Sequence, residues 1–256
     1  MKVENEDAEG LNLLVPPYRV DVQRPCDVVE DILRIYGYNN VEIPTELKSS
    51  LTIAEEADKN YHRENIIGEQ LVGAGFSEIM NNSLTKSSYY EEAGLNAYPW
   101  EETVKVMNPL SADLGVMRQT LLFGGLESIV RNVNRKAQNL RFFEVGNVYK
   151  YNKERWTEEN PVKAYSQDYH MALWVTGKRV QGSWAHPDEE SSFYELKAHV
   201  ENILRRIGVA QGLLVSEKSD NNVFDKAIAL KTRAGKVLVE MGILSHKLLK
   251  RFGLDQ

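Results

Sequence analysis

Four carboxylates lie close together near the start of the sequence: Asp21, Asp27, Glu30 and Asp31. On a helix the last three would share one face, because they are spaced i, i+3 and i+4. Like charges this close repel unless something offsets them, and Mg²⁺ is commonly held by one or two carboxylates with water. Acidic side chains also stabilise a helix N-terminus, and Arg34 follows four residues after Glu30. From the residues alone, the helix-terminus interpretation is favoured over a metal site.

A second candidate lies in the stretch VKVMNPLSADLGVMRQTLL, residues 104–122. Asn108 and Pro109 mark a turn after a strand, and Arg118 precedes a helix. An arginine at such a place could hold a phosphate or the carboxylate of a partner, which makes these three residues candidates for an interface. The alternative, which the residues alone favour, is that Arg118 forms an ordinary surface salt bridge.

A third candidate is the basic run that contains Arg131, Arg135, Lys136 and Arg141. It could contact a nucleic-acid backbone, although cations at the solvated C-terminal end of a helix are the commoner explanation. The five histidines have no metal-ligand spacing, and the sequence contains no GxSxG, Walker or GxGxxG motif. No catalytic residue is therefore predicted.

The composition sets limits on the class of protein. The chain has 256 residues and a formal net charge of -6, which argues against nucleic-acid binding through bulk charge. Its single cysteine, Cys26, excludes a disulfide framework and fits a reducing compartment. The sequence has no apolar run long enough for a membrane span and no signal-peptide pattern, so a cytoplasmic protein is expected. Both ends look interrupted, and we expect the chain to be part of a longer one.

The elements that position these candidates predict an α+β fold, a mostly antiparallel sheet with helices packed on it. Alternation with period two predicts strands with one covered face, and helix 117–137 is expected to be irregular at Gly124 and Gly125. A polar, proline-bearing segment places a boundary near residues 45–50. Helices are expected at 25–37, 57–74, 117–137, 192–208 and 245–253. Strands are expected at 10–15, 76–85, 103–110, 140–152, 169–177, 226–235 and 236–244.

Five stretches together resemble one family. The first is YRVDVQRPCDVVEDILRIYGYNNVEIP, and the others follow in the family's order: GAGFSEIMNNSL, VMNPLSADLGVMRQTLL, NLRFFEVGNVY and FYELKAHVENIL. They are similar to the bacterial phenylalanine–tRNA ligase β subunit, and the resemblance covers roughly residues 11–253. It implies that residues 1–47 are the C-terminal part of a small winged-helix-like domain. Residues 48–256 would then be a class II synthetase-like core that is not catalytic.

The resemblance changes the interpretation of the four carboxylates. In the family, residues at the positions of Asp21, Asp27, Glu30 and Asp31 bind a magnesium ion shared with the α subunit. Asp31 stands where glutamate is usual, so its shorter side chain makes it the least secure ligand. With the resemblance included, magnesium binding is favoured over a role at the helix terminus.

The resemblance also implies that the class II catalytic groups are missing. Lys150 and Asn152 stand where a working enzyme has an arginine and an acid that hold ATP and the tRNA end. Ser245 and His246 stand where it has an acid and an ATP-stacking arginine. Lysine lacks the bidentate fork of arginine, and asparagine carries no charge. Nothing evident would stabilise charge at the α-phosphate.

The function implied by the resemblance is structural. The chain would bind the catalytic α subunit within an assembly of two α and two β chains that joins phenylalanine to its tRNA, using ATP at the α subunit and magnesium. An editing domain would precede it and an anticodon-binding domain would follow. The rival is a free-standing nucleic-acid-binding module. A class II-like ligase for a small molecule is the weakest alternative, because the arginine pair is missing.

Overall fold

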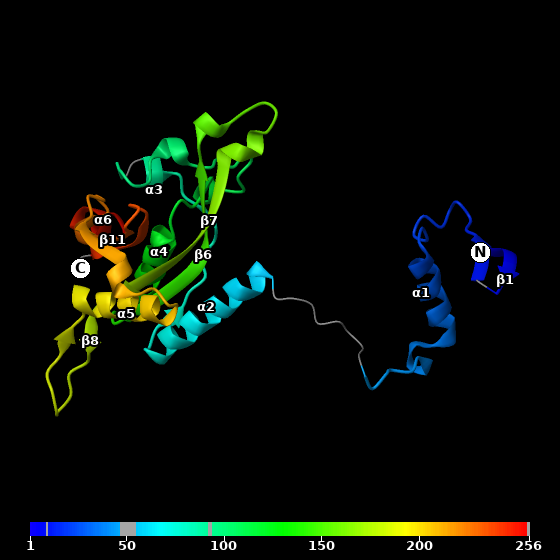
Figure 1. Cartoon of the computed structure of the whole chain (residues 1–256), viewed down its shortest axis with the longest axis horizontal. Coiled ribbons are helices and arrows are strands. Elements are labelled where there is room, and N and C mark those ends of the chain that lie inside the picture. The colour runs from blue at the N-terminus through cyan, green and yellow to red at the C-terminus, as the bar shows by residue number, and fades with distance from the viewer. Residues whose placement is uncertain (9, 47–54, 92–93, 255–256) are drawn as a thin grey trace. The chain divides into compact units, whose positions relative to one another are not determined.

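The computed structural model describes residues 1–8, 10–46, 55–91 and 94–254 (Figure 1). The chain divides into two compact units, Met1–Ile53 and Ala54–Gln256. Within the described ranges, no helix is long and apolar enough to cross a membrane.

The first unit consists of a hairpin and a helix. Strand β1 (Lys2–Asp7) pairs antiparallel with β2 (Gly10–Leu14), and helix α1 (Pro25–Tyr36) follows. Proline suits the first turn of α1, where its missing N–H costs no helical hydrogen bond. The helix ends at Gly37, whose φ of 93° is readily adopted only by glycine. The sequence predicted α1 and β2 but not β1, which carries no clear alternation of apolar residues.

The second unit contains two three-stranded sheets and several short elements. One sheet has the order β3-β6-β7, with β3 parallel and β7 antiparallel to β6, and the other has the antiparallel order β10-β11-β12. The pairs β4–β5 and β8–β9 are separate. The helices are α2 (Glu56–Gly73), α3 (Ser88–Glu91), α4 (Leu122–Val133), α5 (Phe193–Arg206) and α6 (His246–Arg251). The strands are β3 (Ser77–Glu78), β4 (Leu84–Thr85), β5 (Val116–Met117), β6 (Arg141–Tyr151), β7 (Tyr165–Val175), β8 (Lys178–Val180), β9 (Glu189–Glu190), β10 (Leu214–Lys218), β11 (Phe224–Thr232) and β12 (Val237–Leu244).

The central sheet is covered on both faces at the end formed by residues 141–145 of β6 and 171–175 of β7, whereas residues 165–170 of β7 are largely exposed. Adjacent residues of β6 point to opposite sides, so Phe142 belongs to one hydrophobic cluster and Phe143 to another. The expectation of one covered face is therefore wrong for this strand. The mixed α+β architecture with antiparallel sheets agrees with the prediction.

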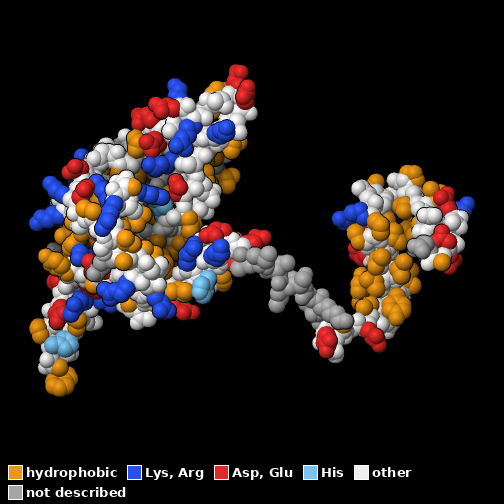
Figure 2. Space-filling model, viewed as in Figure 1, with side chains coloured by type: hydrophobic (Ala, Val, Ile, Leu, Met, Phe, Trp, Pro, Cys, Tyr) orange, Lys and Arg blue, Asp and Glu red, His pale blue; other side chains and the backbone are white. Residues whose placement is uncertain are grey.

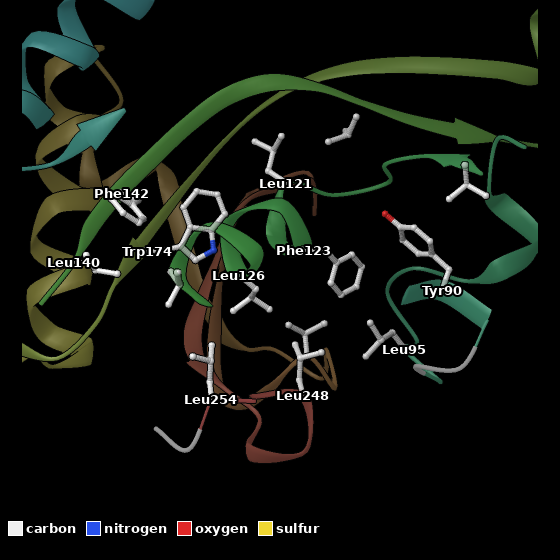
Figure 3. Packing of buried hydrophobic residues seen from close by; sticks show 14 residues of the cluster. Tyr90, Leu95, Leu121, Phe123, Leu126, Leu140, Phe142, Trp174, Leu248 and Leu254 are labelled. Carbon is white, nitrogen blue, oxygen red and sulfur yellow. The ribbon is translucent and has the colours of Figure 1, made fainter. Parts of the chain in front are cut away.

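One face of the sheet contacts the main core, which is built around Phe123 of α4 (Figure 3). Tyr90 of α3 packs edge-on against this ring at 5.3 Å between centroids, and Leu126, Trp174 and Leu248 belong to the same cluster. These side chains come from α3, α4, β7 and α6. The core therefore joins segments from the beginning, middle and end of the unit.

Helices α2 and α5 cover the other face of the sheet. Leu71 of α2, Phe143 of β6 and Ile203 of α5 form the centre of this second cluster. Val200 and Met241 belong to a third cluster, through which α5 also packs on the sheet β10-β11-β12. The long helix α5 thus connects the two sheets.

Helix α4 is regular through both of its glycines, which corrects the expected irregularity. A Cβ at Gly125 would lie 2.2 Å from Trp174, and one at Gly124 would lie 2.8 Å from Asn81. The glycines therefore allow a close approach between α4 and its neighbours rather than a break in the helix. The helix begins at Leu122, because the preceding residues form β5 and its connection.

The predicted strands 76–85 and 103–110 are largely irregular. The first contains only the short strands β3 and β4, and the second contributes an isolated bridge between Lys105 and Val116. A long-range pair fixes the nearby loop: the backbone N–H of Asn96 donates to the side chain of Asn222, and that of Asn222 donates to the side chain of Asn96, both at 3.1 Å. Side chains thus hold the loop that lies between these two segments.

Candidate functional site

Two of the four carboxylates are brought together by an arginine. Arg19 Nη2 lies 2.9 Å from Asp21 Oδ2 and 2.7 Å from Asp31 Oδ2. The hydrogen bond from Arg19 lowers the pKa of Asp21, and the two carboxylates together raise the pKa of Arg19. The positive charge that offsets their repulsion is therefore supplied by the chain itself.

The other two carboxylates are engaged within α1. Asp27 accepts hydrogen bonds from the backbone N–H of Gln23 at 2.9 Å and of Arg24 at 2.8 Å, before the first turn. These backbone bonds, with a further bond from the Arg24 side chain, lower the pKa of Asp27 to about 2. Glu30 accepts from Arg34 at 2.7 Å, four residues along the helix. Both contacts are those expected of the helix-terminus interpretation.

The fit of the four carboxylates to a magnesium ion can be judged from this geometry. Among residues that the structure describes, no group of three or more His, Cys, Asp or Glu side chains is arranged to hold a metal. Asp21 and Asp31 converge on Arg19, whereas Asp27 and Glu30 contact other partners. In this arrangement the carboxylates do not form a magnesium site, and shared magnesium binding stays a prediction.

Arg118 lies inside the second unit. Its side chain is 8% exposed, and Nη1 lies 2.6 Å from Oε1 of Glu144, whose side chain is 2% exposed. Nε of Arg118 also donates to the carbonyl of Asn147 at 2.9 Å. Both interpretations made from the sequence placed this arginine at the surface. The correction is that Arg118 forms a buried ion pair, so its guanidinium is not presented to a partner.

The buried pair is part of a polar network that the sequence analysis missed. Asn81 donates to both carboxylate oxygens of Glu144, through its backbone N–H at 3.1 Å and its side chain at 2.6 Å, and Ser128 donates to Asn81 at 3.0 Å. Gly146 makes room for the guanidinium, since a Cβ there would lie 2.3 Å from Arg118 Nη2. The sequence did contain a signal for this network: Glu144 is the only acid in the stretch LRFFEVGNV, and a carboxylate that is buried needs a partner.

The other two interface candidates lie in an exposed loop. Asn108 and Pro109 are both exposed, and they are flanked by Met107, which is 93% exposed, and Leu110, which is 95% exposed. Two large apolar side chains held almost fully in solvent on either side of a turn are typical of a contact surface. Of the three interface candidates, Asn108 and Pro109 therefore lie in a loop that exposes apolar surface to a partner, whereas Arg118 exposes no charge.

The basic run is not one continuous patch. Arg131, Arg135 and Lys136 are exposed near the end of α4, whereas Arg141 is bound to Glu195 through Nε at 3.1 Å and Nη2 at 2.8 Å. With one cation paired inside the fold, the geometry gives no support to the nucleic-acid-binding alternative.

The positions compared with the class II catalytic groups have contacts of their own. Lys150 Nζ lies 3.1 Å from Glu102 Oε2. Asn152 accepts from the backbone N–H of Glu154 at 2.9 Å and so caps the short 3-10 helix Lys153–Arg155. Both side chains thus contact other residues of the same chain.

Ser245 and His246, the other two positions compared with class II catalytic groups, lie at the beginning of helix α6. The hydroxyl of Ser245 accepts from the backbone N–H of Leu248 at 3.3 Å, which is an N-cap contact. His246 donates its backbone N–H to Asp225 at 3.2 Å. The side chain of Ser245 and the backbone N–H of His246 thus take part in starting this helix.

Comparison with known proteins decides the family. A model of the phenylalanyl tRNA synthetase β chain CLM domain matches residues 43–256, and a model of the tRNA synthetase B5 domain matches residues 1–38. The chain belongs to the phenylalanyl-tRNA synthetase β chain family. The resemblance found in the sequence is therefore confirmed.

Relatives within this family match the whole chain. The phenylalanine–tRNA ligase β subunit of Bacteroides thetaiotaomicron is 57% identical over 255 residues, which is 100% of this chain and 31% of the relative. The corresponding protein of Porphyromonas gingivalis is 46% identical over 256 residues, again 100% of this chain and 31% of the relative. The chain thus spans about a third of the length of these synthetase β subunits.

The fold also occurs in a solved synthetase. A pyrrolysyl-tRNA synthetase from Desulfitobacterium hafniense superimposes with a TM-score of 0.52 over 76% of this chain and 62% of that chain, at 13% identity. At this identity the likeness shows the fold alone.

Proposed function

We propose that this chain is a docking and assembly part of the β subunit of a phenylalanine–tRNA ligase, and that it does not form an aminoacyl adenylate. The observation that carries the proposal is the state of the four positions compared with catalytic groups. Lys150 is paired with Glu102, Asn152 and Ser245 cap short helices, and His246 begins one of them. Each residue makes a structural contact in a fold shared with working synthetases.

The chemistry of adenylate formation supports this conclusion. Charge that develops at the α-phosphate must be met by donors already in place, and arginine does this with a planar fork. Lys150 can supply only one point charge, without the second parallel donor of an arginine, and its charged neighbour Glu102 lies 3.1 Å away. Asn152 is neutral and supplies no charge to a nucleotide, and its side-chain oxygen accepts a hydrogen bond from a backbone N–H.

An exchange assay tests the absence of catalysis. The full-length β chain alone should show no ATP–pyrophosphate exchange with phenylalanine, whereas the assembled enzyme should show it. The chain of residues 1–256 should also be silent. Turnover by either preparation without the α subunit would contradict the proposal.

The exposed loop at residues 107–110 is the proposed contact with the catalytic α subunit. Met107 and Leu110 present apolar area beside the turn at Asn108 and Pro109. Burying such side chains contributes about 25 cal/mol for each Å² removed from water. The full-length β chain carrying Met107→Ser and Leu110→Ser should co-elute less with the α subunit in size-exclusion chromatography. Val162→Ser, at a side chain 73% exposed outside this loop, is the matched control.

The remaining parts of the proposal come from the family. The assembly would contain two α and two β chains in the cytoplasm, with ATP used at the α subunit and the phenylalanine tRNA bound by the whole enzyme. Residues 1–47 would be the end of a winged-helix-like domain, and residues 48–256 a synthetase core without catalysis. The hairpin β1–β2 and helix α1 are elements that such a winged domain contains.

Magnesium binding at Asp21, Asp27, Glu30 and Asp31 remains part of the proposal, shared with the α subunit. Arg19 holds Asp21 and Asp31 through contacts that are partly exposed, so binding of Mg²⁺ requires Arg19 to release these two carboxylates. Calorimetric titration of the assembled enzyme with Mg²⁺ should lose one site per αβ pair when Asp21 and Asp31 are changed to alanine. An unchanged number of sites would contradict it.

A further inference from the structure

A hairpin carries a fully exposed tryptophan away from the second unit. Strands β8 and β9 form its base, and Trp184 at its tip is 100% exposed. Figure 1 shows the hairpin projecting beyond the sheets and helices, and Figure 2 shows hydrophobic side chains at the end of the projection. Tryptophan has a large apolar surface, so its complete exposure calls for an explanation.

The tip is held in shape by contacts of its own. Asp188 accepts from the backbone N–H of Gly182 and from Lys178 Nζ, the latter at 2.5 Å. Ser183 donates its backbone N–H to the carbonyl of His186 at 2.9 Å, which closes the loop around Trp184. A side chain presented by an ordered loop loses less conformational entropy when it binds.

The base of the hairpin is fixed to the body of the unit. The backbone N–H of Lys178 donates to the side chain of Asn139 at 2.9 Å, and Arg141 Nη2 donates to the carbonyl of Arg179 at 3.1 Å. Arg141 is itself bound to the buried Glu195 of α5. The exposed indole is therefore connected to the core through successive hydrogen bonds.

The charges of the hairpin favour a protein partner over a nucleic acid. The tip, residues 181–187, contains no Asp, Glu, Lys or Arg. At the base, Lys178 is paired with Asp188 at 2.5 Å and Arg179 with Glu189 at 3.0 Å, and Glu190 adds a further negative charge. Three acidic side chains at the base outnumber its two cations, so the hairpin as a whole does not attract phosphate groups. An aromatic centre surrounded by polar groups is the usual pattern of a protein–protein anchor.

We propose that Trp184 is an anchor that inserts into an apolar, indole-sized pocket on the catalytic subunit, so this inference rests on the proposed function. If the partner were a segment of the same chain, it would be held nearby at a millimolar effective concentration and would need little binding energy to stay in contact. A separate chain has no such advantage, and a rigid, buried tryptophan can supply the binding energy that its association requires. The pocket should present a hydrogen-bond acceptor to the indole N–H and basic groups toward the acidic base.

The affinity of the full-length β chain for the α subunit tests the anchor. Trp184→Ala should weaken assembly about 30-fold or more, the effect expected of a hot-spot residue, and Trp184→Phe should restore much of the loss. Because the side chain is fully exposed, its removal leaves the fold intact. Trp156→Ala is the matched control: that indole is 47% exposed and lies next to a different loop, so its removal should leave the affinity unchanged. Equal affinities for wild type and Trp184→Ala would overturn the inference.

A photo-crosslinker identifies the surface that Trp184 meets. Trp184→p-benzoylphenylalanine in the assembled enzyme should crosslink to the α subunit. Crosslinking to the tRNA, to other parts of the β chain or to nothing would overturn the inference. The proposed function is tested separately: if the loop variant Met107→Ser with Leu110→Ser weakens assembly while Trp184→Ala does not, the docking role stands without this anchor. If the wild-type chains do not assemble, the proposed function itself is wrong.

Discussion

Each unit holds an arginine against a carboxylate at nearly the same distance, but in different surroundings. Arg19 lies 2.7 Å from Asp31, with side chains 33% and 29% exposed, whereas Arg118 lies 2.6 Å from Glu144, with side chains 8% and 2% exposed. Water and salt screen the first pair, so it can open at low cost when another charge arrives. The second pair cannot open without leaving a charge in the core. Burial, rather than distance, therefore separates a replaceable contact from a permanent one.

The same contrast appears in packing. Helix α1 has no buried residue, and its Ile32 and Ile35 are 52% and 92% exposed. In the second unit Phe123 and Phe143 are 1% and 2% exposed. The described part of the first unit is thus held mainly by local hydrogen bonds and ion pairs, and the second by a hydrophobic core.

The largest expected effect comes from breaking the buried pair. Glu144→Ala leaves Arg118 and two donors of Asn81 without their partner, so the free energy of unfolding should fall by about 3–5 kcal/mol. Urea unfolding of the chain measures it. Asp31→Ala is the matched control, because Arg19 keeps Asp21 and contact with water. Equal losses for both variants would contradict the contrast drawn between the two pairs.

A smaller effect tests the packing of α4. Gly125→Ala places a Cβ 2.2 Å from Trp174, so the tryptophan or the helix must shift. Overpacking of this kind should lower the free energy of unfolding by about 1–3 kcal/mol. Gly73→Ala, in α2 with no atom within 4 Å of its Cβ, should be neutral or stabilising. A neutral Gly125→Ala would show that α4 and β7 have room between them.

The pH dependence of α1 gives a third test. The folded pKa of Asp27 is about 2, whereas an unperturbed aspartate has a pKa of about 3.9. Its contribution to stability is therefore complete above about pH 4 and is lost as the pH falls through about 2. The carboxyl carbon shift of Asp27, followed by NMR, should titrate near the lower value. Titration near 4 would mean that the backbone N–H groups of Gln23 and Arg24 do not hold this carboxylate.

The smallest effect is expected at the exposed helix pair. Glu30→Ala removes the contact with Arg34, but side chains 57% and 66% exposed exchange it readily for water. The unfolding curve should stay within experimental error of the wild type, and any difference should vanish in high salt. A large, salt-independent loss of stability would show that the Glu30–Arg34 contact is permanent, as the buried Arg118–Glu144 pair is.

The sequence predicts well where one pattern decides the structure. Apolar spacing located α1, α2 and α5, and alternation located β6, because in these segments the local preference and the core agree. It failed for the strands expected at 76–85 and 103–110, which are short or irregular in the structure. In the first of them, Asn81 is held by Glu144, which is 63 positions away. Such contacts depend on the completed fold and leave no periodic signal.

The candidate residues show the same division. The helix-terminus role of Asp27 followed from local spacing, and the structure provides the contacts for it. The position of Arg118 did not follow, because its partner Glu144 is 26 residues away and the intervening helix had to be placed first. Sequence analysis found the charged residues but could not tell which of them the fold would bury.

The reciprocal contact between Asn96 and Asn222 has a consequence for synthesis on the ribosome. The two residues are separated by 126 positions, and the core near them joins Tyr90 with Leu248 and Leu254. Because a chain emerges from its N-terminal end, this core cannot close until almost all of the unit has left the exit tunnel. Helix α4 and the hairpin β6–β7 can form earlier from local contacts. Nascent chains that stall before residue 222 should therefore expose Phe123 and its neighbours to chaperones, and emergence of α6 should end that exposure.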